Sequence, residues 1–309
     1  MLIESGVSPI DIKLKFEELL KEILQSVDKY SNPVSPEDIF NIASISANND
    51  QTIGKLIYEA FQHVGTEGVI TMEDSKTDST YIETVSGYKI ERGYVSPYFV
   101  TDPVKKVAEY ENPLILVTDK KVRFTQEVAP ILNECIRHKK PLVIIADEVE
   151  SQALSLFVVN RLRADFPIVA IKAPAYGERR GELLKDIALA TGTTFVSETS
   201  GHKLEDVTIE HLGSCAKIIV HKDETIIIEG SGDPDAIKTQ IESLKQTLVG
   251  NTDDYIREKT LQRIGNLNSR VAVVYVGAAT ETELKEKKHR MDDARSAIVT
   301  GKQIGRAHV

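Results

Sequence analysis

Short apolar runs alternate along the middle of the chain with longer stretches in which apolar residues recur every three or four positions. The short runs are typical of buried strands, and the periodic stretches are typical of amphipathic helices. The predicted strands are 114–117, 141–146, 167–171 and 194–196, and the predicted helices between them are 123–137, 150–163 and 180–190. This order predicts βαβ units and a parallel sheet with helices on both faces, which is an α/β fold.

The flanks of this region are more helical. Helices are predicted over 1–29, 35–44 and 51–63, with a short strand at 69–72. After the middle region, a hairpin at 217–220 and 225–228 precedes helices at 234–248 and 253–267, a strand at 271–276 and a helix at 281–293. The length of 309 residues suggests about two domains.

Composition excludes several classes of function. Lys and Arg number 38 against 47 Asp and Glu, and the net charge of −9 disfavours nucleic acid as a partner. Residues 1–6 lack the pattern of a signal peptide, and no apolar run approaches the length of a membrane span. The two cysteines, Cys135 and Cys215, cannot form a disulfide framework. We therefore expect a soluble cytoplasmic protein with neither nucleic acid nor membrane as a partner.

The common catalytic signatures are missing. The sequence has no phosphate loop, dinucleotide fingerprint, zinc-protease helix, paired CxxC or nucleophile elbow. Cys135 and His138 are three apart on a predicted helix, but zinc needs three or four ligands, so no metal site is predicted. The loop between Lys172 and Arg180 follows a predicted strand, where α/β sheets often bind ligands. Its arginines can equally make structural ion pairs.

The predicted helix at 150–163 is more apolar than a covering helix needs to be. Its apolar residues are Ala153, Leu154, Leu156, Phe157, Val158, Val159 and Leu162. A helix that covers a sheet should keep a polar outer face, so this excess indicates an exposed apolar surface, which generally marks a binding site. Another apolar segment, 94–100, holds three aromatic residues, although its pattern alone favours core packing.

At these residues the sequence resembles the group I chaperonins, the bacterial GroEL class. The blocks that resemble the family, in the family's order, are 45–48, 68–71, 92–99, 119–121, 172–174, 277–281, 285–288 and Asp293. The resemblance runs from about residue 8 to residue 293. It implies a GroEL-like apical domain, with a parallel-strand-rich core, flanking helices and a hairpin, plus a small α+β intermediate domain.

The resemblance also implies a division of the chain. Residues 1–28 resemble the end of an equatorial-domain segment, residues 29–85 and 272–297 the two halves of the intermediate domain, and residues 86–271 the apical domain. The rest of the ATP-binding equatorial domain has no counterpart in this sequence, so the chain resembles an apical-plus-intermediate fragment. Residues 298–309 match nothing in the family and are expected to be artefactual.

In the family, a groove between two apical helices and a neighbouring segment binds non-native polypeptides and the loop of a GroES-type co-chaperonin. The matching positions are Tyr94, Ser96, Tyr98, Phe99, Ala129, Leu132, Leu154, Phe157, Val158, Val159, Asn160 and Arg163. Ala129 stands where the family usually has a larger aliphatic residue, and Asn133 and Gln152 stand where it has acidic groups. These departures bear on affinity.

Other residues take roles only through the resemblance. Asp293 matches the aspartate that orients the attacking water in ATP hydrolysis, although its local pattern is that of a solvated aspartate. ATP and magnesium are expected only for a full-length subunit, and this fragment is not expected to hydrolyse ATP alone. Arg92 and Glu281 match a pair that links neighbouring subunits.

The hinge between the domains also departs from the family. Gly87 is retained, but Ser269 and Arg270 replace a glycine pair. Because a Cβ narrows backbone freedom, we expect stiffer apical movement.

The resemblance therefore implies a subunit of a homo-oligomeric chaperone ring that releases its clients in an ATP cycle. Two alternatives stay open. One is a small-molecule α/β enzyme with its site between Lys172 and Arg180. The other is a divergent paralogue without foldase activity, which Ala129, Ser269 and Arg270 favour.

Overall fold

The computed structural model describes residues 8–30, 38–65, 69–197, 199, 201, 203–250 and 253–304. The chain divides into two compact units: unit 1 holds residues 1–63, 70–83 and 273–309, and unit 2 holds residues 64–69 and 84–272. The strands β2 (Tyr81–Ile90) and β11 (Arg270–Val276) each contribute residues to both units.

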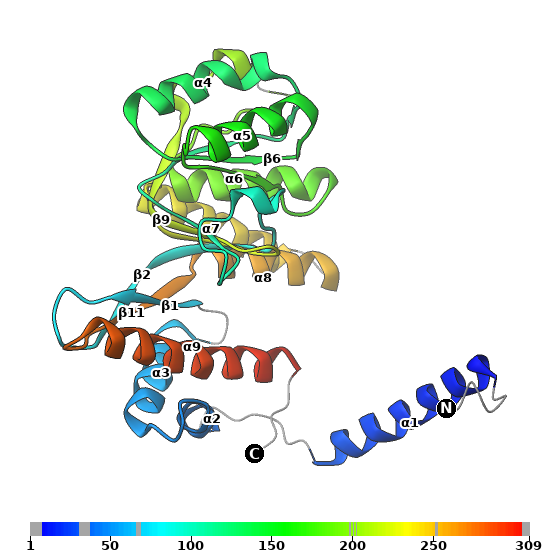
Figure 1. The fold of residues 1–309 in the computed structure, drawn as a ribbon. Coiled ribbons are helices and arrows are strands. Elements are labelled where there is room, and N and C mark those ends of the chain that lie inside the picture. Colours follow the sequence, from blue (N-terminus) through cyan, green and yellow to red (C-terminus); the bar gives the residue numbers. More distant parts are fainter. Residues whose placement is uncertain are drawn as a thin grey trace. The chain divides into compact units, whose positions relative to one another are not determined.

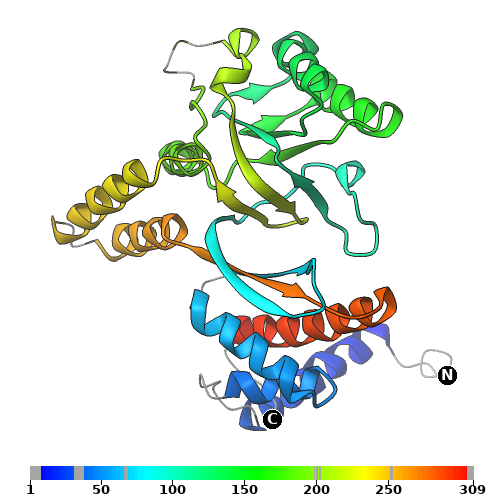
Figure 2. The same cartoon turned by 90° about the vertical axis from the view of Figure 1, so that its left-hand side faces the viewer.

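Unit 1 is built from helices and a short piece of sheet. Its elements are α1 (Pro9–Tyr30), α2 (Asp38–Ser46), α3 (Gln51–Val64), β1 (Val69–Asp74), the end of β11, and α9 (Glu281–Ile304). Asp50 caps α3, because its Oδ1 accepts the Thr52 and Ile53 amides at 2.9 and 3.2 Å. Helix α2 packs against α9 (Figure 2), and Ala43 of α2 and Met291 of α9 are fully buried.

Unit 2 contains a mixed sheet. Its strands run in the order β2, β10 (Thr225–Gly230), β9 (Gly213–Val220), β4 (Leu114–Val117), β6 (Leu142–Ala146) and β8 (Ile168–Lys172), and β3 (Ala108–Glu111) also pairs with β9. β4, β6 and β8 are parallel, with Leu114 opposite Leu142 and Leu142 opposite Ile168. The pairings β2–β10, β10–β9, β9–β4 and β3–β9 are antiparallel. The predicted parallel core and hairpin are therefore both present.

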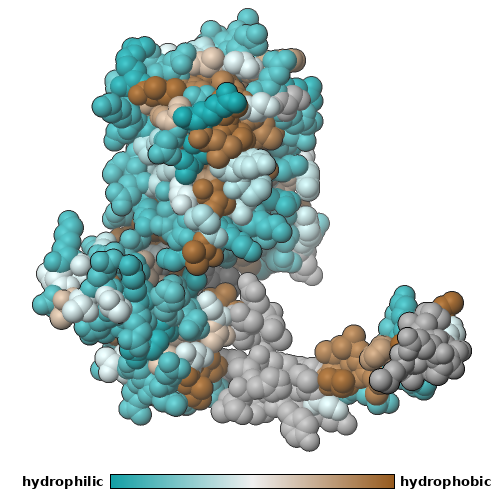
Figure 3. All heavy atoms as spheres, viewed as in Figure 1, coloured by the Kyte–Doolittle hydropathy of each residue, from teal (hydrophilic) through white to brown (hydrophobic). Residues whose placement is uncertain are grey.

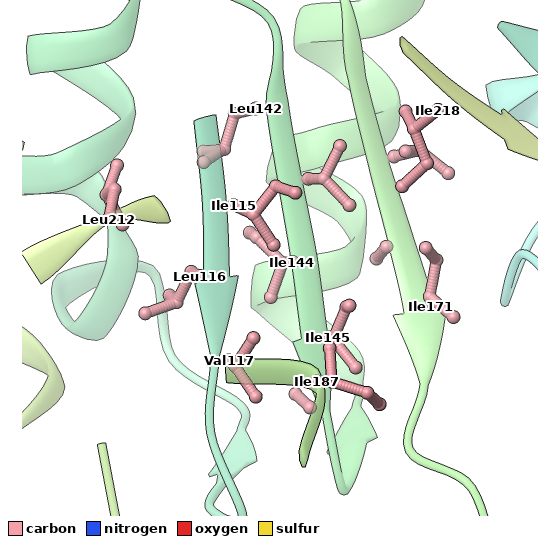
Figure 4. Packing of buried hydrophobic residues seen from close by; sticks show 14 of the residues in the cluster. Ile115, Leu116, Val117, Leu142, Ile144, Ile145, Ile171, Ile187, Leu212 and Ile218 are labelled. Carbon is pink, nitrogen blue, oxygen red and sulfur yellow. The ribbon is translucent and has the colours of Figure 1, made fainter. Parts of the chain in front are cut away.

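Helices cover both faces of the parallel strands. Figure 1 shows α4 (Thr125–His138) and α5 (Ser151–Arg163) on one side of β6 and α6 (Gly177–Thr191) on the other. The hairpin of α7 (Pro234–Gly250) and α8 (Asp254–Leu267) packs against α6. All five residues of β6 are buried, as expected for a strand that is covered on both faces. Figure 4 shows Ile115, Ile144 and Ile187 within the core that results.

Shorter elements complete unit 2. They are the 3₁₀ turns η1 (Pro97–Phe99), η3 (Leu204–Asp206) and η4 (Ile209–His211), and a two-stranded parallel pair of β5 (Lys121–Val122) and β7 (Glu148–Val149). Tyr110 on β3 joins η1 to the sheet. Its hydroxyl lies 3.4 Å from the Phe99 carbonyl and 3.1 Å from the Ile168 carbonyl.

The predicted α/β class is confirmed, and three details differ. The predicted strand at 194–196 is reduced to one parallel bridge between Thr118 and Val196. β2 and β3 were not predicted, because their residues mix polar and apolar types and they are stabilised by distant partners. Helix α9 continues to Ile304, into the segment predicted as an unrelated tail. Residues 1–7 of the first predicted helix and 305–309 of the predicted tail lie outside the described residues.

No helix among the described residues combines the length and the apolar character that crossing a bilayer requires.

Candidate functional site

Helices α4 and α5 lie side by side and run in the same direction. Each connects the end of one parallel strand to the start of the next, and α5 also contacts β8 and η1. The start of α4 is fixed by Glu127, whose Oε2 accepts the amides of Arg123 and Phe124, both at 2.8 Å. The helix ends at Lys139, which adopts the left-handed conformation with φ of 52°.

Helix α5 keeps apolar residues on its solvent side. Ala153 and Phe157 face the sheet and are fully buried. Leu154, Leu156 and Val158 are half-buried. Val159 and Leu162 are 45% and 60% exposed. The apolar excess that the sequence shows over 150–163 therefore reaches solvent.

Helix α4 contributes to the same surface. Val128, Ile131 and Cys135 are buried against the core, whereas Ile136 is 39% exposed and Ala129 is half-buried. We call the exposed and half-buried apolar residues of the two helices the α4–α5 surface: Ala129, Ile136, Leu154, Leu156, Val158, Val159 and Leu162. Figure 3 shows apolar atoms gathered over these two helices.

The neighbouring segment presents one aromatic ring to solvent. Tyr98 on η1 is 59% exposed, whereas Phe99 is fully buried. Ser96 is also buried, and its Oγ accepts the Tyr98 amide at 3.4 Å, so it caps this short turn. Tyr94 is half-buried, with its amide bonded to the His221 carbonyl at 3.1 Å.

Three of the residues expected to contact a bound polypeptide belong to the core. The exposed fractions of Phe99, Leu132 and Phe157 are 0%, 3% and 0%. Leu132 and Phe157 lie on the sides of α4 and α5 that face the sheet, where apolar contact with strands outweighs contact with water. In this structure they lie in the core beneath the α4–α5 surface. The expectation that they contact a bound polypeptide directly is corrected to a role in packing.

Ile136 and Leu162 are surface residues that the sequence analysis did not assign to the site. The signal was present: Ile136 lies four positions after Leu132, and Leu162 lies three after Val159, so each continues an apolar stripe by one helical turn. Both helices are apolar on more than one side, and the pattern does not fix which side packs on the sheet.

The polar residues of the predicted groove make few contacts with their surroundings. Asn160 donates its Nδ2 to the Leu156 carbonyl at 2.9 Å, within its own helix. Arg163 is exposed and has no ion pair within the described part of the chain. Asn133 and Gln152 are also exposed.

Asp293, on α9 in unit 1, is exposed and has no hydrogen-bond or ion-pair partner among the described residues. Its neighbours Met291 and Ala294 are buried, so Asp293 lies on the outer side of the helix. Among the described residues there is no group of three or more His, Cys, Asp or Glu side chains that could hold a metal ion.

The two residues of the predicted subunit contact, Glu281 and Arg92, each have a partner close by. Glu281 pairs with Lys285 of its own helix at 2.7 Å, and both side chains are largely exposed. The Lys285 ammonium lowers the pKa of the Glu281 carboxyl. Arg92 lies over the ring of Tyr176, with its Cζ 6.0 Å from the ring centroid.

Gly87 is required by close packing between strands. A Cβ at this position would lie 2.3 Å from Val271 Cγ2 and 3.2 Å from the Ile227 carbonyl oxygen. The Gly87 amide donates to the Ser269 carbonyl at 3.2 Å, so the two predicted hinge segments are bonded to each other. Neither Ser269 nor Arg270 has a positive φ, and their side chains impose no backbone strain here.

The loop between Lys172 and Arg180 borders a cavity of about 450 Å³. Tyr88, Arg92, Tyr176, Arg179 and Asn266 are among the residues that line it. Arg179 donates to Gln262 Oε1 at 3.0 Å, and Arg180 makes an ion pair with Asp147. Both arginines of the loop therefore make structural contacts.

The two cysteines are buried and unpaired. Burial raises the pKa of both the Cys135 and the Cys215 thiol to about 12. A thiol that stays protonated at neutral pH is a poor nucleophile, so neither cysteine has the character of a catalytic residue.

An exposed apolar helix face on an α/β unit is the kind of surface that generally marks a binding site. The chain matches the TCP-1/cpn60 chaperonin family over residues 1–304 and belongs to that family. Its general role is therefore that of a chaperone in protein folding, which binds non-native polypeptides. The match includes the start of the 298–309 segment that was expected to be unrelated to the family.

Proposed function

We propose that this chain is the apical and intermediate part of a group I chaperonin subunit, and that the α4–α5 surface with Tyr98 binds exposed apolar segments of non-native polypeptides. The observation that carries the proposal is the exposed apolar side of α5, where Val159 and Leu162 are 45% and 60% exposed above a core that is already complete. Apolar attraction is not directional, so such a surface accepts many different clients.

The expected strength of one such surface is modest. Burying one large apolar side chain contributes roughly 1.5–3 kcal/mol. Three or four side chains engaged together give about 5–10 kcal/mol, from which ordering an unfolded segment removes several kcal/mol. One surface therefore binds weakly, and a ring of identical surfaces binds tightly because each contact raises the effective concentration of the next.

The proposal extends to the partners of the full-length subunit. We expect a homo-oligomeric ring in the cytoplasm, in which a GroES-type co-chaperonin competes for the α4–α5 surface. ATP and magnesium would bind residues outside those described here, and Asp293 would act only in that assembled state. Its exposed position on α9 suits a residue that meets its partners on assembly. Arg92 and Glu281 would then meet between neighbouring subunits.

A second candidate function rests on the cavity beside the Lys172–Arg180 loop, whose volume of about 450 Å³ suits a small molecule. Its arginine and tyrosine side chains favour an anionic or aromatic ligand. Against an enzyme stands the engagement of Arg179 and Arg180 in structural contacts. A paralogue that keeps the fold without foldase activity would differ from the main proposal only in its effect on clients.

The test is the suppression of client aggregation, followed by light scattering. Val159→Ser combined with Leu162→Ser should abolish most of the suppression, because it removes the two most exposed apolar side chains of α5. Leu261→Ser is the matched control, because Leu261 is 54% exposed on α8, and this variant should behave like wild type. Leu132→Ser is unsuitable, since Leu132 is buried and its loss would perturb the fold.

Three outcomes separate the candidates. Equal suppression by wild type and the α5 double variant would exclude the α4–α5 surface as the binding site. No suppression by the wild-type chain would favour the paralogue without foldase activity. Loss of a small-molecule thermal shift in Arg179→Ala, with suppression unchanged, would support an independent function of the cavity.

A further inference from the structure

One end of the α4–α5 surface carries a concentration of positive charge. Because α4 and α5 run in the same direction, their carboxyl ends lie at the same end of the pair. The basic residues at or just beyond these two ends are Arg137, His138, Lys139, Lys140, Arg161 and Arg163. The whole chain, by contrast, has a net charge of −9.

Part of this charge is neutralised locally. Arg137 pairs with Glu134, and Arg161 pairs with Asp165 at 2.6 Å. Lys139, Lys140 and Arg163 are exposed and make no ion pair within the described part of the chain. These three cations are therefore available to a ligand that occupies the α4–α5 surface.

The opposite end of the surface is electrically balanced. Lys121 pairs with Glu148 at 2.9 Å, and Arg123 lies 3.8 Å from Glu150. The Glu127 carboxylate is already engaged by the two backbone amides at the start of α4. The charge along the surface is therefore asymmetric, with cations matched by carboxylates at the amino ends of the helices and a surplus of cations at their carboxyl ends.

The carboxylates within the two helices, Glu127 and Glu134, are both engaged, Glu127 by backbone amides and Glu134 by Arg137. Asn133 and Gln152, exposed on α4 and α5, are neutral amides. A negatively charged ligand therefore meets attraction at one end and little repulsion along the helices. Charges at the rim of an interface mainly set the association rate, the salt dependence and the choice of partner, while apolar burial supplies most of the affinity.

We propose that the α4–α5 surface selects apolar segments that carry a run of aspartate or glutamate residues at one end. This inference rests on the proposed function, since it assigns a class of client to the same surface. The apolar part of the segment covers Val159 and Leu162, and its carboxylates lie against Arg163 and the lysines beyond α4. Segments that end in basic residues are disfavoured, because they bring like charges together.

The test uses fluorescent peptides with one apolar core and a run of Glu, Gln or Lys at one end, and it measures their anisotropy with the full chain. At about 50 mM salt the Glu peptide should bind roughly five- to tenfold more tightly than the Gln peptide, and the Lys peptide more weakly than both. At about 500 mM salt these differences should largely disappear, because the charges are exposed and screened.

Variants of one residue locate the effect. Arg163→Glu should reduce or reverse the preference for the Glu peptide, and Arg163→Gln should reduce it partly. Lys238→Glu on α7 makes the same change of charge at another exposed site and should leave the preference intact. Far-ultraviolet circular dichroism of each variant shows that the fold is retained.

The outcomes separate the charge preference from the proposed binding of apolar segments. If all three peptides bind equally to wild type, or the Lys peptide binds most tightly, the charge preference is wrong and the apolar surface still stands. If Arg163→Glu keeps the full preference, the inference is also overturned. If no peptide binds at either salt concentration, the proposed function fails together with it.

Discussion

Helices α5 and α6 cover opposite faces of the same parallel strands, and their outer sides differ in chemistry. α5 exposes Val159 and Leu162 to solvent. The exposed side chains of α6 are polar, with Glu178 and Lys185 among them. Covering the sheet therefore does not require an apolar outer face. The apolar side of α5 adds nothing to the burial of the strands, and this supports the binding role proposed for it.

A buried ion pair joins α6 to α8. Asp186 is 1% exposed, and Arg263 of α8 binds it through two hydrogen bonds of 2.6 and 3.0 Å. Gln240 of α7 donates to the same carboxylate at 3.2 Å. The buried charge of α6 is therefore fully paired. On α5, by contrast, apolar side chains remain exposed to solvent.

The largest expected effect comes from breaking the buried pair. Arg263→Met leaves the Asp186 carboxylate buried without its partner and should destabilise unit 2 by about 3–5 kcal/mol. The measurement is the urea midpoint of unfolding. Glu182, the other ion-pair partner of Arg263, has a side chain that is 56% exposed. Glu182→Gln should therefore lower the free energy of unfolding by less than about 1 kcal/mol. Equal midpoints for the two variants would show that the Arg263–Asp186 pair does not stabilise the packing of α8 on α6.

A smaller loss of stability is expected from truncations on α4, and it should differ between the buried and the exposed side of the helix. Leu132→Ala removes a buried side chain and should destabilise the fold by about 2–5 kcal/mol, because a cavity is left in the core. Ile136→Ala truncates an exposed residue one turn later and should change stability by about 0.5 kcal/mol while weakening client binding. Urea unfolding and peptide anisotropy measure the two quantities. A large loss of stability in Ile136→Ala would place that residue in the core.

The smallest effect is confined to alkaline pH. Burial raises the pKa of the Cys135 thiol from 9.0 to about 12, so the folded state holds its proton more tightly than the unfolded state. The stability linked to this proton is complete below about pH 9 and is lost as the pH rises towards 12. The Asp186 carboxylate raises the pKa of Arg263, so the α6 face keeps its charge pair over this range.

Hydrogen exchange measured between pH 9 and 12 tests this difference. Amides of α4 should lose protection before those of α8. Cys135→Ala should make the stability less dependent on pH, and an unchanged dependence in that variant would assign the effect to other groups such as Cys215.

The sequence allowed the parallel strands and their helices to be predicted, because each has its own period of apolar residues. The unusual character of α5 was also visible, since seven of its positions between Ala153 and Leu162 are apolar. The rotation of each helix on the sheet could not be predicted. It depends on contacts with β8 and η1, which are distant in sequence, and these contacts bury Phe157 and leave Val159 outside.

The strands β2 and β3 could not be predicted for a related reason. The apolar pattern of β2 is interrupted by polar residues and by Gly87, and its partner β10 lies far along the chain. The role of Gly87 becomes visible only when Val271 is placed beside it. Local pattern carries no information about such a neighbour.

The hydroxyl of Tyr110 has a consequence for the work that a client must do. Because it reaches both the Phe99 and the Ile168 carbonyl, it fastens the turn that carries Tyr98 to the sheet. Burial raises its pKa to about 12, so the phenol remains a donor in any ordinary buffer. The backbone of this turn is thus held in place before an encounter, so the backbone entropy lost on docking falls mainly on the incoming chain.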